Sequence, residues 1–184
     1  MNAMLMVLAM GLFPGLAQQS VDAAPVMPAH VRNSFAFEVN APMREVAQLF
    51  GPEGERCWAG KHWNPVFVWP QPARDVQGAV FTVQHGEHTS VWVNTVFDLA
   101  AGRMQYVAVI PDAMTFTVDV KLTAASASLT KVDVTYTRTA LDAAVNDDMA
   151  AMGARDRENG PYWEKEIEGA LKSGRIGRCA GAAK

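Results

Sequence analysis

The sequence lacks the short motifs that identify several large classes of enzyme. It contains no Gly-x-Ser-x-Gly nucleophile elbow, no phosphate-binding loop and no dinucleotide-binding glycine fingerprint. Hydrolase, nucleotidyl-transfer and dehydrogenase interpretations therefore have no support, and we expect no cofactor. An Asn-x-Ser/Thr glycosylation sequon is also absent.

Clusters of basic residues are lacking as well. The 16 Lys and Arg residues are scattered among 19 Asp and Glu residues, which gives a formal charge of -3 and an isoelectric point near 5.8. Nucleic-acid binding usually requires a basic face, and an amphipathic membrane anchor usually carries a basic polar side. We therefore expect neither nucleic acid nor a membrane surface as a partner.

Long hydrophobic runs are absent except at the N-terminus. Residues Met1–Ala17 carry no charge, and Val21 and Ala23 suit the -3 and -1 positions of a signal-peptidase site after Ala23, with Ala17 as a second site. The run is broken by Pro14-Gly15 and is shorter than the roughly 20 residues of a membrane span. A signal peptide over residues 1–23 predicts a periplasmic or secreted protein with no stable membrane span. Because no Lys or Arg precedes the run, a mis-assigned start, an uncleaved anchor and a cytoplasmic location stay open.

Cysteine is scarce, with only Cys57 and Cys179. In an oxidising compartment the two thiols could pair, and closing a loop of roughly 120 residues would stabilise the fold by about 4 to 5 kcal/mol in the chain-entropy model. Against this pairing, Cys179 lies in a glycine- and alanine-rich tail that we expect to fray. Both alternatives stay open.

The remaining sequence predicts one domain over residues 33–173, after a linker over residues 24–32 and before a flexible tail over residues 174–184. Phe35, Phe37 and Val39 alternate in a first strand over residues 33–40. A short helix begins near Pro42, and a second short helix and turn occupy residues 51–65, which contain two tryptophans.

After Pro65 the pattern changes to strands joined by short turns, which favours an antiparallel meander. The expected strands are residues 66–69, 79–85, 90–99, 104–110, 115–124 and 130–140. A helical apolar stripe from Val145 to Leu171 must then cover one face of the sheet. Pro161 interrupts the stripe and predicts either a kink or the start of a second helix.

These elements resemble the SRPBCC family of the START-like superfamily. The resemblance rests on Phe35–Val39 followed by Asn40-Ala41-Pro42, on Gly54-Glu55-Arg56-Cys57-Trp58-Ala59 with Trp63-Asn64-Pro65, on Gly78-Ala79-Val80-Phe81-Thr82 and on Val91-Trp92-Val93. It implies an α+β helix-grip fold, in which a curved antiparallel sheet of about seven strands wraps around a long C-terminal helix, with two short helices between strands 1 and 2. It also implies a largely apolar cavity for a hydrophobic or amphipathic small molecule, in a monomer or weak dimer.

Aromatic residues and methionines are the candidates for the cavity wall. They are Trp58, Trp63, Phe81, Tyr106, Phe116, Tyr136, Met149, Met152, Tyr162 and Trp163. For any single one of them, core packing is the favoured alternative. The resulting hypotheses are a non-catalytic carrier or sensor, and an enzyme that resembles polyketide cyclases and dehydratases.

Candidates for catalysis are few. His85 could act as a general base with Arg138 or Asp156 as its polar partner. A metal site at His85 and His88 would need further ligands on a turn where the side chains diverge, so we expect none. Glu53 and Glu55 are interpreted as capping and ion-pairing groups, with Arg56 as the partner.

Overall fold

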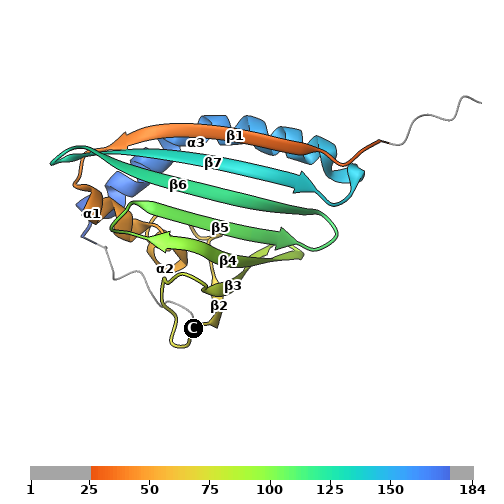
Figure 1. The fold of residues 1–184 in the computed structure, drawn as a ribbon, viewed down its shortest axis with the longest axis horizontal. Helices are drawn as coiled ribbons and strands as arrows, with labels where there is room; N and C mark the ends of the chain where they lie inside the picture. The colour runs from red at the N-terminus through yellow and green to blue at the C-terminus, as the bar shows by residue number, and fades with distance from the viewer. Residues whose placement is uncertain (1–25, 175–184) are drawn as a thin grey trace, which may run out of the picture.

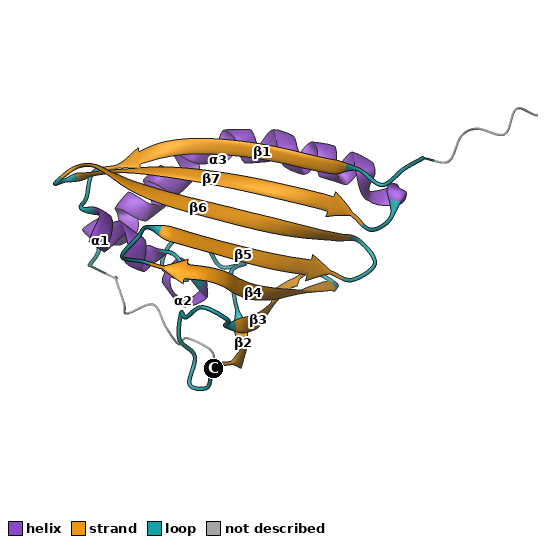
Figure 2. Ribbon diagram, viewed as in Figure 1, coloured by secondary structure: helices purple, strands orange, loops and turns teal. Residues whose placement is uncertain are grey.

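The computed structural model describes residues 26–174, which form one curved antiparallel sheet with three helices and two 3-10 turns packed on one of its faces (Figures 1 and 2). The strands are β1 His30–Val39, β2 Val66–Trp69, β3 Val80–His85, β4 His88–Asp98, β5 Arg103–Ile110, β6 Met114–Ser126 and β7 Leu129–Ala140. Their order in the sheet is β1-β7-β6-β5-β4-β3-β2. The predicted seven-stranded helix-grip fold is confirmed.

The connection between β1 and β2 contains the short helices. It is made of α1 Met43–Val46, the 3-10 turn η1 Ala47–Leu49 and α2 Pro52–Glu55. Phe35, Phe37 and Val39 are buried on the inner face of β1, as their alternation predicts. The strand itself begins at His30, inside the stretch predicted as a linker, because residues 30–33 pair with β7.

Strand β4 departs from simple alternation. Thr95 is an extra residue relative to β5, because Asn94 pairs with Tyr106 and Val96 pairs with Gln105. Such a bulge shifts the side-chain alternation by one position. Trp92 and Asn94 therefore face inward before the bulge, whereas Phe97 packs on the core after it. A regular two-residue alternation over residues 90–99 therefore does not hold in this strand.

The long helix α3 Asn146–Lys172 follows the 3-10 turn η2 Ala143–Val145 and crosses behind β1 and β7 (Figure 1). It continues through Pro161, so of the two predicted alternatives, a kink or a second helix, the second helix does not form. Buried residues lie on both sides of the proline, among them Asp156 and Ile167. We attribute the continuity to this packing, which offsets the roughly 3 kcal/mol that proline costs in a helix interior.

Small residues allow α3 to approach β1 closely. A Cβ atom at Gly160 would lie 3.2 Å from the Ala36 carbonyl oxygen, and one at Gly153 would lie 2.6 Å from the Asn33 amide nitrogen. A larger side chain at Gly160 would meet the β1 backbone, whereas one at Gly153 would require the Asn33 side chain to move. The helix therefore forms the back wall of the domain at short distance from β1.

A buried ion pair also joins α3 to the sheet. Arg138 on β7 and Asp156 on α3 are 7% and 4% exposed. The guanidinium donates two hydrogen bonds to the carboxylate, one of them 3.0 Å long. Such bidentate geometry is the strong form of this interaction.

Some predictions concern residues outside the described range. They are the signal peptide over residues 1–23, most of the tail over residues 174–184 and the pairing of Cys57 with Cys179. Cys57 itself is buried. Across residues 26–174, no helix combines the length and apolar character that crossing a membrane requires.

We predict that the Asp156→Leu variant lowers the free energy of unfolding by about 3 to 5 kcal/mol, because it leaves the Arg138 charge buried and unpaired. Urea denaturation measures this loss. The double variant Arg138→Met/Asp156→Leu should recover most of the stability, since it removes both charges. Equal instability of the single and double variants would show that packing volume, and not charge, is decisive.

Candidate binding cavity

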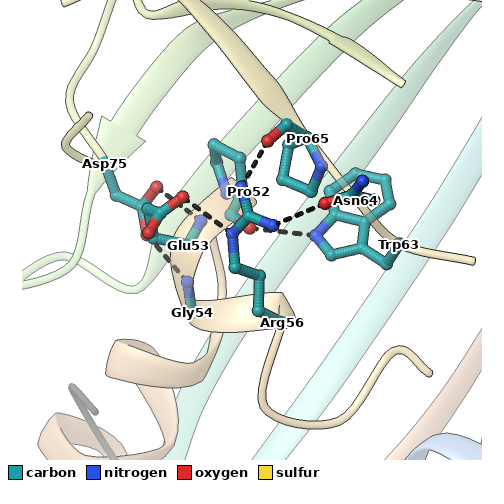
Figure 3. Close-up of polar contacts among 8 residues, drawn as sticks. All are labelled: Pro52, Glu53, Gly54, Arg56, Trp63, Asn64, Pro65 and Asp75. Carbon is teal, nitrogen blue, oxygen red and sulfur yellow. Dashed lines mark hydrogen bonds and ion pairs between the residues drawn. The ribbon is translucent and has the colours of Figure 1, made fainter. Parts of the chain in front are cut away.

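The segment between Gly51 and Pro65 is attached to the sheet through Asp75, in the loop between β2 and β3 (Figure 3). The Asp75 carboxylate accepts hydrogen bonds from the backbone N–H groups of Glu53, at 2.9 Å, and Gly54, at 3.0 Å. Gly51 has φ of 100°, and a Cβ atom there would lie 2.6 Å from an Asp75 carboxylate oxygen. Glycine at this position therefore allows the loop to cap α2.

Arg56 holds the other side of the segment (Figure 3). Its Nε donates to the Glu53 carboxylate at 2.8 Å, and its terminal nitrogens donate to the Asn64 side chain and the Pro65 carbonyl. The predicted ion pair between Glu53 and Arg56 is confirmed. The result is a closed turn that leads directly into β2.

The two tryptophans of this segment point inward from the turn. Trp58 donates its indole N–H to the Leu49 carbonyl at 2.6 Å, and Trp63 donates to the Pro52 carbonyl at 3.0 Å. Because both polar tips are satisfied by backbone, their ring faces are available for apolar contacts. Trp58 packs edge-to-face on Trp163 of α3, with ring centroids 4.8 Å apart.

A cavity of about 160 Å³ lies between this segment, the inner face of the sheet and α3. Its lining residues are Glu55, Trp58, Ala59, Trp63, Trp92, Tyr106, Val118, Val120, Tyr136, Tyr162 and Trp163. Tyr162 is 51% exposed, whereas Trp58 and Tyr106 are buried. The cavity therefore opens to solvent beside Tyr162 and ends at the sheet.

Six of the ten residues proposed from sequence for a ligand wall lie at this cavity. They are Trp58, Trp63, Tyr106, Tyr136, Tyr162 and Trp163. These residues come from four separate parts of the chain, namely the segment between Gly51 and Pro65, β5, β7 and α3, and the fold brings them to one place. Their contact with a ligand stays a prediction.

The other four proposed wall residues lie elsewhere. Phe81 is fully buried and stacks on Trp92, and Phe116 packs edge-to-face on the same ring. Met149 and Met152 belong to a second apolar cluster, around Met114 near the start of α3. These residues support the cavity wall or the far end of the domain without lining the cavity.

The three proposed catalytic residues do not form one site. His85 lies on the surface at the end of β3, where partial desolvation of its ring and the nearby His62 lower its pKa. Arg138 and Asp156 are buried and satisfy each other. His85 is absent from the cavity wall, so no general base reaches the ion pair from β3.

Glu55 is the functional candidate that the sequence interpretation missed. Burial raises the pKa of its carboxyl from 4.5 to about 8, and the nearby Asp75 charge adds to the rise. Hydrogen bonding from the Gly51 N–H and the Tyr106 hydroxyl acts in the opposite direction. Tyr106 in turn accepts a hydrogen bond from Gly51 N–H at 2.9 Å. Glu55 is therefore a cavity carboxyl group that holds its proton at neutral pH.

A local signal for this position existed in the sequence. Trp58 and Ala59 follow Glu55 by three and four positions, a spacing that places side chains on the same face of a helical turn. A buried Trp58 therefore implies an inward Glu55. The interpretation of Glu55 as an ion-pairing group is wrong for residues 26–174, where its carboxylate has no cationic partner.

Comparisons with known proteins show the fold. No family model matches the chain, and no curated protein matches it. Norcoclaurine synthase from Thalictrum flavum aligns with a TM-score of 0.58 at 9% identity, over 92% of this chain and 99% of that protein. Ara h 8.0201 aligns with a TM-score of 0.56 at 15% identity, over 79% and 99%. DynU16, from the dynemicin biosynthetic locus, aligns with a TM-score of 0.52 at 15% identity, over 79% of this chain and 48% of that protein. At these identities the likeness supports a helix-grip architecture and no particular activity.

We predict that the free energy of unfolding falls as the pH rises from about 5 to 8. A carboxyl that ionises at 4.5 when unfolded and near 8 when folded keeps its proton in the folded state only, so stability decreases by about 1.4 kcal/mol per pH unit. Burial also raises the pKa of the Asp75 carboxyl, to about 6. Below pH 6 this second group therefore adds to the decrease in stability with rising pH.

The Glu55→Gln variant should remove the part of this fall between pH 6 and 8 and be more stable than the unaltered protein at pH 8. The control is Glu53→Gln, which removes the same charge from the same helix. Its free energy of unfolding should still decrease between pH 6 and 8. Urea denaturation across the pH range measures both. Parallel curves for Glu55→Gln and the unaltered protein would contradict the assignment.

Proposed function

We propose that this protein is a non-catalytic carrier or sensor of the SRPBCC type, which binds a compact hydrophobic or amphipathic molecule in the cavity beneath α3. The observation that carries the proposal is the cavity itself, a space open beside Tyr162 with a largely aromatic wall and few polar groups. Sites for small molecules share this combination of apolar walls and few polar groups.

The size of the cavity restricts the ligand. Its volume of about 160 Å³ is below the roughly 300 to 1,000 Å³ typical of drug-sized ligands. It is close to the ~150 Å³ of an engineered cavity that binds benzene. We therefore propose a ligand of about the size of one aromatic ring, rather than a long-chain lipid.

The catalytic alternative, an enzyme that resembles polyketide cyclases and dehydratases, has less support. Its proposed base, His85, is exposed and away from the cavity. The two remaining candidates are held in a mutual ion pair. If residues 1–23 act as a signal peptide, the carrier would work in the periplasm or outside the cell.

We predict that indole and benzyl alcohol bind the protein and that palmitate does not, as measured by ligand-observed NMR and calorimetry. The Trp63→Ala variant should weaken indole binding about 3- to 10-fold, because it removes one aromatic contact from the wall. Trp69→Ala is the matched control, since Trp69 is 53% exposed on β2 and does not line the cavity.

Binding of palmitate in preference to indole would contradict the proposed ligand size. Equal affinity of Trp63→Ala and the unaltered protein for indole would place the ligand outside this cavity. Native mass spectrometry of the protein purified from its own host would then identify the natural ligand by its mass.

A further inference from the structure

The aromatic residues of the cavity are of a particular kind. Seven of its eleven lining residues are tryptophan or tyrosine. They include four of the five tryptophans and all three tyrosines of the chain, while no phenylalanine of residues 26–174 lines the cavity. Phenylalanine would fill an apolar core equally well. The faces of tryptophan and tyrosine rings also attract cations, most strongly for tryptophan.

A carboxyl group without a counter-charge lies within this aromatic wall. Glu55 is 9% exposed and is the one acidic residue among those that line the cavity. The adjacent Arg56 is paired with Glu53, and Arg138 is paired with Asp156. Within the described range the Glu55 carboxylate therefore has hydrogen-bond donors and no cation.

Together these features match the chemistry of an organic ammonium group. A quaternary or protonated amine gains from electron-rich ring faces and from one negative charge at close range, and it has an apolar surface that a metal ion lacks. We propose that the cavity binds a compact organic cation, whose ammonium group lies against the Glu55 carboxylate and the tryptophan and tyrosine faces. This inference rests on the proposed small-molecule function and specifies its ligand class.

The protein already makes such a contact in the same wall. The Arg138 guanidinium lies over the Tyr136 ring, 4.4 Å from its centroid. Its charge is balanced by Asp156, so it does not oppose a second cation. The four tryptophans of the wall form two edge-to-face pairs, Trp58 with Trp163 and Trp63 with Trp92.

Binding of a cation should be coupled to the protonation of Glu55. The groups that face Glu55 are Asp75 from the loop between β2 and β3, Tyr106 on β5 and Tyr136 on β7. Both tyrosines stay neutral, because burial and the Glu55 charge raise the pKa of each. A bound ammonium lowers the pKa of Glu55, so binding at pH 7 releases a proton. Affinity for a permanent cation then rises up to about tenfold per pH unit and levels off above pH 8.

Two matched pairs of probes test the inference by calorimetry on the full chain. Choline and 3,3-dimethylbutan-1-ol share a shape and differ by nitrogen for carbon, and benzylamine differs from benzyl alcohol by an ammonium group. We expect each cation to bind at least about tenfold more tightly than its neutral partner at pH 8.5. Choline affinity should fall at pH 6, while the affinity of its neutral partner stays constant.

Neutral partners that bind as tightly as the cations, or more tightly, at every pH would overturn the inference and leave the proposed small-molecule function intact. Failure of all four probes, together with indole, would overturn both. An affinity for choline that does not change between pH 6 and 8.5 would show that Glu55 is not the anionic partner.

The Glu55→Gln variant tests the residue directly. It should lose the preference for cations, with choline affinity reduced about tenfold or more at pH 8.5, and retain its affinity for 3,3-dimethylbutan-1-ol. The retained binding shows that the cavity is intact. Glu53→Gln, which removes a charge on the same helix outside the cavity, should keep the preference. A preserved preference in Glu55→Gln would overturn the assignment.

Discussion

The contact between α3 and the sheet is the constraint on which the cavity depends. A curved antiparallel sheet has an apolar concave face that water must not reach, and α3 is the element long enough to cover it (Figure 1). Gly153 and Gly160 permit the approach, and the ion pair between Arg138 and Asp156 fixes the helix across β7. The space that remains beside Tyr162, between α3, the segment between Gly51 and Pro65, and the sheet, is the cavity.

Most of the fold could be predicted from local pattern. Val132, Val134 and Tyr136 alternate without interruption in β7, and turn residues separate each strand from the next, so the strand order along the chain and the antiparallel meander follow from the sequence. The continuity of α3 could not be predicted in this way. Proline predicts a break from local energetics, and only the tertiary packing of Asp156 and Ile167 shows that the helix continues.

The candidate site was less accessible from the sequence. Aromatic residues could be proposed for a wall because they are few and large, but Phe81 and Tyr106 have the same local signature and only one of them lines the cavity. The environment of Glu55 depends on Asp75 and Tyr106, which lie 20 and 51 positions further along the chain. The spacing to Trp58 indicates an inward Glu55, but the pKa of its carboxyl also depends on residues that only the fold brings close.

The bulge at Thr95 divides β4 into two halves that face different parts of the interior. The first half presents Trp92 to the cavity, and the second presents Phe97 to the packing around Gly51. One inserted residue thus lets a single strand contribute to the ligand wall and to the support of the turn that carries Glu55. Trp92 and Phe97 are five positions apart, so without the bulge a regular strand would place the two aromatic rings on opposite faces of the sheet. The bulge therefore allows one strand both to line the cavity and to support the turn beside it.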